Sequence, residues 1–166
     1  EAGVIRLNLR SEGEVREAFD TVMTHARAHV PDSAIRGILN TVKLIAMVGI
    51  SPKDSRPSYF AFKYLLERGY RMIPVNPGQA GKEILGQKVY AALKDVPAPV
   101  DMVDIFRASD SVGPVVAEAV THLTGRRTIW MQLGVVNDAA AAMARAAGLA
   151  VVMNRCPAID IPRLGL

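Results

Sequence analysis

The most informative stretch of the chain runs from residue 43 to residue 58 and reads KLIAMVGISPKDSRPS. Its five consecutive apolar residues, 44–48, predict a strand buried on both faces, which is typical of a parallel sheet covered by helices. Gly49 permits a tight turn directly after this strand. The loop that follows contains two prolines and leads into a segment of helical periodicity. The stretch therefore predicts a strand–loop–helix unit.

The same alternation of strand and helix patterns continues along the chain. Short apolar runs predict further strands at 71–75, 100–106, 128–133 and 149–153. Helical periodicity predicts helices at 58–68, 111–123 and 137–147. Five strands joined by right-handed crossovers predict an α/β fold, a Rossmann-like doubly wound parallel sheet with the strand order 3-2-1-4-5. Between the second and third strands, residues 88–90 predict a short extended piece and residues 91–94 one helical turn.

Two more helices are predicted before this series. Ser11 and Glu14 bracket a capping-box pattern, and apolar residues then recur at helical spacing up to Pro31. Asp32 or Ser33 can cap a second helix that ends before residue 43. We therefore expect an N-terminal helical extension, residues 1–40, followed by a Rossmann-like domain, residues 41–166.

The composition excludes several classes of protein. The 166 residues are 50% hydrophobic and 22% charged, which is incompatible with large-scale disorder. No apolar run reaches the length of a membrane span and no secretory signal is recognisable, so we expect a cytoplasmic protein that binds no membrane. The net charge of +4 comes from scattered basic residues, which argues against nucleic acid and favours a small anionic ligand. Cys156 is the only cysteine, which fits a reducing compartment.

The loop after the first strand carries residues suited to an anion. Gly49 permits a tight turn, Ser51 and Ser58 supply hydroxyls, and Lys53 and Arg56 supply positive charge beside a helix N-terminus. The complete dinucleotide fingerprint G-x-G-x-x-G is absent. We interpret the loop as a phosphate-binding site; the alternative is a surface loop whose serines only cap the helix.

The ends of the other strands lie at the same edge of the sheet, where doubly wound folds bind their ligands. The second strand is followed by Asn76 and Pro77 rather than by the acid that holds the ribose of NAD. NAD is therefore disfavoured, whereas coenzyme A (CoA) and NADP stay open. The later strand ends add further candidate ligand contacts: Phe106, Arg107, Gln132, Gly134 and Asn137. The structural alternatives are that Arg107 is only a surface charge and that Asn137 is only a helix N-cap.

The sequence contains no recognisable catalytic or metal-binding constellation. His25 and His29 share a helix face, but no carboxylate or cysteine completes a metal site. Asp101 and Asp104 are three residues apart on a strand and so lie on opposite faces, which excludes an acid pair. Cys156 follows the last strand, and we expect a buried, inert thiol rather than one that forms a mixed disulfide with CoA.

Eight short segments together resemble a known family. They are 48–51 (VGIS), 56–58 (RPS), 69–71 (GYR), 73–77 (IPVNP), 84–86 (ILG), 101–107 (DMVDIFR), 130–134 (WMQLG) and 154–156 (NRC). In this order, over about residues 40–160, they resemble the small YccU-like CoA-binding proteins. The domain of that family is similar to the N-terminal CoA-binding domain of the succinyl-CoA synthetase alpha subunit.

The resemblance implies coenzyme A as the cofactor. It places the phosphates on Gly49, Ser51, Arg56 and Ser58, and the adenosine beside Asn76 and Pro77. A synthetase alpha subunit has a second domain with a phosphorylated histidine, for which we find no counterpart, so we expect non-catalytic binding of CoA or an acyl-CoA at the carboxyl edge of the sheet. The alternative is an NADP-dependent reductase or the nucleotide-binding subunit of an acyl-CoA synthetase. A protein partner and a homo-oligomer both stay open.

Overall fold

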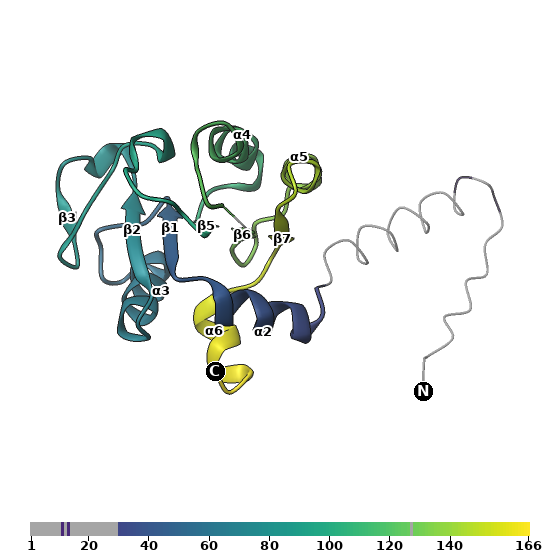
Figure 1. Cartoon of the computed structure of the whole chain (residues 1–166), viewed down its shortest axis with the longest axis horizontal. Coiled ribbons are helices and arrows are strands. Elements are labelled where there is room, and N and C mark those ends of the chain that lie inside the picture. The colour runs from purple at the N-terminus through teal and green to yellow at the C-terminus, as the bar shows by residue number, and fades with distance from the viewer. Residues whose placement is uncertain (1–10, 12, 14–29, 127) are drawn as a thin grey trace.

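The computed structural model of the protein describes residues 11, 13, 30–126 and 128–166 (Figure 1). The predicted helix that begins at Ser11 lies largely outside these residues. The second predicted helix is present as α2 (Asp32–Thr41). Its N-cap is Pro31, and neither Asp32 nor Ser33 caps it as expected. The Asp32 carboxylate instead accepts hydrogen bonds from Arg163, a partner far away in sequence.

A five-stranded parallel sheet forms the centre of the molecule. Its strands, in chain order, are β1 (Leu44–Val48), β2 (Arg71–Val75), β5 (Met102–Ile105), β6 (Thr128–Met131) and β7 (Ala150–Val152). They are arranged in the order β2-β1-β5-β6-β7, and every pairing is parallel. The α/β, Rossmann-like class and the number of main strands are thus confirmed, with the last three strands shorter than predicted.

The predicted order 3-2-1-4-5 is wrong for these five strands, which follow the order 2-1-3-4-5. The third strand, β5, pairs with β1 and not with β2. The place beside β2 is taken by a single parallel bridge between Val75 and Tyr90. No full strand forms there, because the neighbouring residues make a hairpin of β3 (Glu83–Ile84) with β4 (Gln87–Lys88) and the short 3-10 helix η2 (Leu93–Asp95).

Four further helices complete the fold. They are α3 (Pro57–Glu67), α4 (Val112–His122), α5 (Asp138–Ala146) and α6 (Pro157–Arg163). The first three agree with the predicted helices to within about one residue at each end. The sequence did not predict α6, because it has only seven residues and a proline inside it, which hides its periodicity. Among the described residues, no helix is long and apolar enough to cross a membrane.

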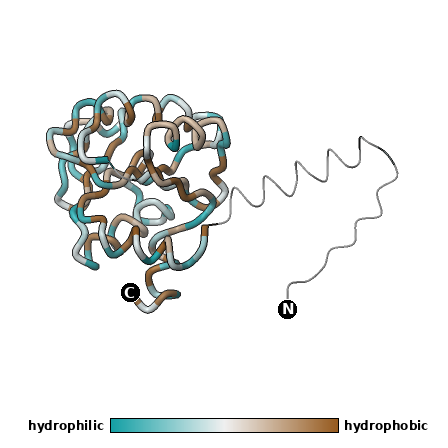
Figure 2. The backbone as a smooth tube through the Cα atoms, turned by 45° about the vertical axis from the view of Figure 1, so that its right-hand side comes forward, coloured by the Kyte–Doolittle hydropathy of each residue, from teal (hydrophilic) through white to brown (hydrophobic). Residues whose placement is uncertain are grey.

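Helices cover both faces of the sheet, as a doubly wound fold requires (Figure 1). One face packs against α4 and α5 through residues such as Val116 and Ala144. The other face packs against α2, α3 and α6 through residues such as Ile35, Phe62 and Ile161. Figure 2 shows hydrophobic segments running through the middle of the body between these layers. The carboxyl ends of the strands are left to the connecting loops, and the candidate site lies there.

Candidate functional site

The turn after β1 depends on a glycine. Gly49 has a φ of +88°, and a Cβ atom at this position would lie 2.1 Å from the carbonyl oxygen of Phe106. Its N–H donates to the carbonyl of Val75 at 2.9 Å, and the N–H of Phe106 donates to the carbonyl of Val48 at 2.8 Å. Three neighbouring strand ends therefore meet at this residue with no room for a side chain.

The loop from residue 51 to residue 58 is fixed by its two outer serines. The Ser51 N–H donates to the Ser58 Oγ at 3.0 Å, and the Lys53 N–H donates to the Ser51 Oγ at 3.1 Å. Ser58 is 6% exposed and lies in the first turn of α3. Because each hydroxyl accepts a backbone hydrogen bond, its own hydrogen stays available to donate to a ligand.

The loop and the end of β5 enclose an open pocket of about 310 Å³. The residues lining it are Gly49, Ser51, Arg56, Pro57, Ser58 and Phe106. Arg56 is the N-cap of α3 and makes no side-chain capping bond, so the first N–H groups of the helix point outward without a side-chain acceptor. The helix dipole, these N–H groups and the guanidinium together make the pocket suited to an anionic group.

Five of the twelve predicted site residues therefore line one pocket. Lys53 belongs to the same loop and is exposed, but it does not line the pocket. Asn76 holds the second strand end against the loop: its amide nitrogen donates to the Ile50 carbonyl at 2.7 Å, and its side-chain oxygen accepts from the Gly78 N–H at 2.9 Å. Pro77 begins the short 3-10 helix η1 (Pro77–Gln79) that follows. Asn76 thus joins the end of β2 to the loop after β1, which lines the pocket.

The remaining predicted residues lie farther along the carboxyl edge. Arg107 follows Phe106, and its side chain passes close to Gly49. The Gly134 N–H donates to the Asn154 side chain at 2.7 Å. Asn137 caps α5 by accepting from the Ala140 N–H, as predicted, and also donates to the Ser109 carbonyl. None of these three lines the pocket.

Gln132 is buried, and its partner is Asp104, which we considered from the sequence only as one half of an excluded acid pair. The Gln132 amide donates to the two oxygens of Asp104, at 2.8 and 3.0 Å. Asp104 is 0% exposed. Burial raises the pKa of Asp104 to about 7, and the hydrogen bond from Gln132 partly opposes this increase. An aspartate in the middle of an otherwise apolar strand was the available sequence signal.

Cys156 lies close to this pair, at the N-cap of α6. Burial raises the pKa of the Cys156 thiol, with smaller lowering contributions from the backbone N–H groups of Ala158 and Ile159. The nearby carboxyls of Asp104 and Asp160 raise it further. These surroundings favour the protonated thiol, which is a poor nucleophile.

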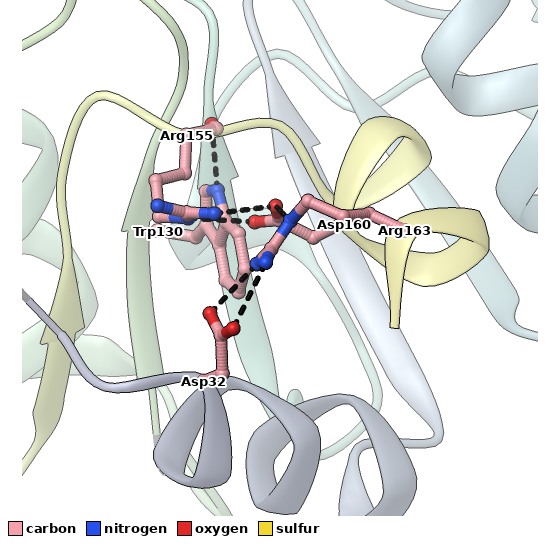
Figure 3. A network of polar contacts seen from close by, with 5 residues as sticks. All are labelled: Asp32, Trp130, Arg155, Asp160 and Arg163. Carbon is pink, nitrogen blue, oxygen red and sulfur yellow. Dashed lines mark hydrogen bonds and ion pairs between the residues drawn. The ribbon is translucent and has the colours of Figure 1, made fainter. Parts of the chain in front are cut away.

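A network of charged side chains fixes the segment that carries this cysteine (Figure 3). Asp160, whose side chain is 3% exposed, accepts from Arg155 at 2.7 Å and from Arg163 at 3.1 Å. Arg163 also pairs with Asp32 on α2 at 2.9 Å. The Trp130 indole N–H donates to the Arg155 carbonyl at 2.8 Å. The network thus joins α2, α6 and β6, and it escaped sequence analysis because its partners are remote in sequence.

Comparisons with known proteins show the family and the fold of the chain. A model of the CoA binding domain matches residues 43–162. The uncharacterized protein YneT of Bacillus subtilis is 38% identical over 122 residues, which are 74% of this chain and 87% of that protein. A hypothetical protein from Pyrococcus horikoshii superposes with a TM-score of 0.78 at 37% identity, over 84% of this chain and 95% of the other.

A larger enzyme contains a similar domain. The dinucleotide forming acetyl-coenzyme A synthetase 1 of Ca. Korarchaeum cryptofilum, solved in complex with phosphate and ADP, has a TM-score of 0.58 and 26% identity to this chain. The likeness covers 66% of this chain but 25% of that synthetase. The family match confirms the resemblance drawn from the sequence and extends over most of the chain. The protein belongs to the family of CoA-binding domains.

Proposed function

We propose that this protein binds coenzyme A, or an acyl-CoA, reversibly and catalyses no reaction by itself. The observation that carries the proposal is the pocket between the β1–α3 loop and Phe106, in which a guanidinium and a helix N-terminus converge. Both features attract negative charge. Coenzyme A is an anionic ligand with a pyrophosphate, and the chain belongs to a family of CoA-binding domains.

The residues around the pocket fit a diphosphate group. Arg56 would pair with the phosphate oxygens, and the hydroxyls of Ser51 and Ser58 would donate to them. Gly49 allows the backbone to approach the phosphates closely, because no side chain stands between β1 and the ligand. Lys53 would add positive charge from the rim of the site.

The rest of the ligand would extend along the carboxyl edge. The adenosine would lie toward Asn76 and Pro77, beside the end of β2. The arm that ends in the thiol would run in the opposite direction, past Phe106 and Arg107 and toward the loop that contains Gly134 and Asn137. In this arrangement Gln132 does not contact the ligand, since its amide is buried against Asp104.

No set of side chains in the described part of the chain suggests catalysis. Cys156 is the only nucleophilic thiol, and its surroundings favour the protonated form. Within residues 30–126 and 128–166, no group of three His, Cys, Asp or Glu side chains could hold a metal ion. The similarity to one quarter of an acetyl-coenzyme A synthetase keeps a subunit of a larger enzyme as the alternative.

Isothermal titration with four ligands tests the proposal. We expect CoA to bind, dephospho-CoA to bind with the same or lower affinity, and NAD to give no measurable heat. A ligand at about 100 times its dissociation constant adds roughly 2.7 kcal/mol to the stability of the fold, so CoA should also raise the Tm. Equal affinity for CoA and NAD would refute the proposal. Tighter binding of NADP than of CoA would favour a reductase.

A further inference from the structure

The pair formed by Asp104 and Gln132 is buried near the strand ends that carry the candidate site: Asp104 is two residues before Phe106, which lines the pocket. Asp104 and Phe106 leave β5 on the same face, because they are two residues apart on an extended strand. Phe106 lines the pocket, and the rise between the two residues is roughly 7 Å. A charge on Asp104 would therefore act on a bound phosphate through the protein interior. Protein screens such a charge much less than water does.

Among the described residues, the group that contacts the Asp104 carboxylate is the uncharged amide of Gln132. The ion pairs of Arg155 and Arg163 are made with Asp32 and Asp160. The neighbouring strands place Met47 and Trp130 beside Asp104. The side chains that α2 and α3 bury against this face are all uncharged.

The remaining neighbour, α6 with its N-cap residue, contributes Arg163, whose guanidinium pairs with Asp160 and Asp32, and two further titratable groups. One is Asp160, which is already paired with Arg155 and Arg163. The other is the thiol of Cys156, which burial keeps protonated at neutral pH. Neither group supplies a positive charge to Asp104, so its carboxylate form is a buried, uncompensated anion. This electrostatic cost explains why its pKa is raised to about 7.

The pair can change its charge without losing its hydrogen bond. The carboxylate accepts from the amide nitrogen of Gln132, as observed. When the carboxyl is protonated, it can donate to the side-chain oxygen of Gln132 after the amide reverses its orientation. Protonation therefore alters the electrostatic potential under the pocket while the loops at the edge of the sheet stay in place.

We propose that ligand binding at this site is coupled to proton uptake by Asp104, with the neutral carboxyl favouring the bound state. The inference rests on the proposed function, since it assumes that the phosphates of a CoA-like ligand occupy the pocket. Two negative charges about 10 Å apart in protein repel each other enough to change affinity by about three- to tenfold. Linkage requires the reverse effect as well, so the bound ligand promotes protonation of Asp104.

The test is isothermal titration of the full chain with dephospho-CoA at about pH 6 and pH 8, in two buffers of different ionisation enthalpy. Dephospho-CoA is the probe because it lacks the 3′-phosphate, which itself titrates in this range. For the wild type we expect proton uptake on binding and an affinity about three- to tenfold higher at the lower pH. Asp104→Asn should abolish both effects. Asp110→Asn, an exposed acid that follows the same strand, is the matched control and should behave like the wild type.

A second variant guards against a folding defect. Gln132→Met removes the donor that lowers the pKa of Asp104, so the pH at which the affinity changes should increase. The coupling is refuted if Asp104→Asn retains the pH dependence of the wild type, or if Gln132→Met leaves the midpoint unchanged. Failure of the wild type to bind dephospho-CoA and CoA at either pH would refute the proposed function instead.

Discussion

The two faces of the sheet are built differently. The face beneath α4 and α5 is a continuous apolar cluster of residues such as Val103, Ile129 and Ala144. All five buried polar or charged residues within the described part of the chain belong to the other face or to the helices that cover it: Ser58, Asp104, Thr128, Gln132 and Asp160. The candidate pocket opens at the edge of this second face. The comparison indicates that one face mainly stabilises the fold, whereas the other also serves the site.

Among the substitutions considered on the face covered by α2, α3 and α6, replacement of Gly49 should reduce the free energy of unfolding most, because this residue is in close contact with Phe106. Gly49→Ala would place a Cβ atom 2.1 Å from a backbone carbonyl, at a φ of +88°. We expect a loss of about 4 kcal/mol or more in the free energy of unfolding, together with loss of CoA binding. Denaturant unfolding monitored by circular dichroism measures it.

Gly134→Ala is the matched control for this substitution. Gly134 has a similar φ of +79°, but a Cβ atom there would meet nothing within 4 Å. Gly134→Ala should therefore lose only about 1 to 2 kcal/mol in the free energy of unfolding, from the strain of the backbone conformation. If the two variants lose equal stability, the close approach of the strand ends is not what requires glycine at position 49.

The stability of the protein should depend on pH through Asp104. Because the pKa of Asp104 is raised to about 7 in the folded protein, its carboxyl favours folding at acid pH, and this contribution is lost as the pH rises from about 4 to 7. Asp104→Asn should therefore gain stability relative to the wild type by about 1.4 kcal/mol per pH unit across that window. Unfolding titrations of both proteins from acid to neutral pH measure this slope. A difference between them that is independent of pH would show that Asp104 titrates normally.

The fold was largely predictable, because its signals are local. The apolar run at 44–48, the turn at Gly49 and the helix after it are neighbours in sequence, and all appear where expected. The strand order was not predictable in the same way. Whether β5 pairs with β1 or with β2 depends on contacts between strands distant in the chain. In the structure, the place beside β2 holds the single bridge at Tyr90, which follows the hairpin at 83–88.

The candidate site was also predictable only where its signals are local in sequence. Its loop residues could be found from the chemistry of phosphate binding, and five predicted residues meet in one pocket. Asp104 could not be interpreted from sequence, because its meaning depends on burial and on Gln132, a partner 28 residues away. The network around Asp160 reaches from α6 to Asp32, 131 residues from Arg163. Such polar contacts leave no periodic pattern.

Loss of the charged network around Asp160 should reduce the free energy of unfolding less than Gly49→Ala does, but more than loss of an exposed ion pair. Asp160→Ala leaves the partly buried Arg155 without its partner, and we expect a loss of about 2 kcal/mol in the free energy of unfolding. Asp32→Ala removes an exposed carboxylate from the same network and should cost much less. Thermal denaturation of both variants compares them. Equal losses would mean that α6 is anchored mainly through α2.

Arg56→Ala should change ligand binding with little change in stability. Its guanidinium would form charge-assisted hydrogen bonds with a phosphate, worth roughly 1.5 to 3 kcal/mol, so the affinity for CoA should fall by about 10- to 150-fold. Arg71→Ala, an exposed arginine at the start of β2, lies at the opposite edge of the sheet and is the control. An affinity within a factor of about two of the wild type would place the phosphates elsewhere.

The smallest effect is expected for the reaction of Cys156 with oxidised CoA, because the surroundings of its thiol keep it protonated. Burial raises the pKa of Cys156, and the nearby carboxyls of Asp104 and Asp160 act in the same direction. Incubation of the native protein with oxidised CoA should therefore yield no mixed disulfide detectable by mass spectrometry, whereas unfolded protein should react. Cys156→Ser identifies any adduct formed elsewhere. A mixed disulfide on native protein that disappears in this variant would show that the thiol is reached by the ligand, so the polar side of the sheet would hold a reactive group as well as a binding site.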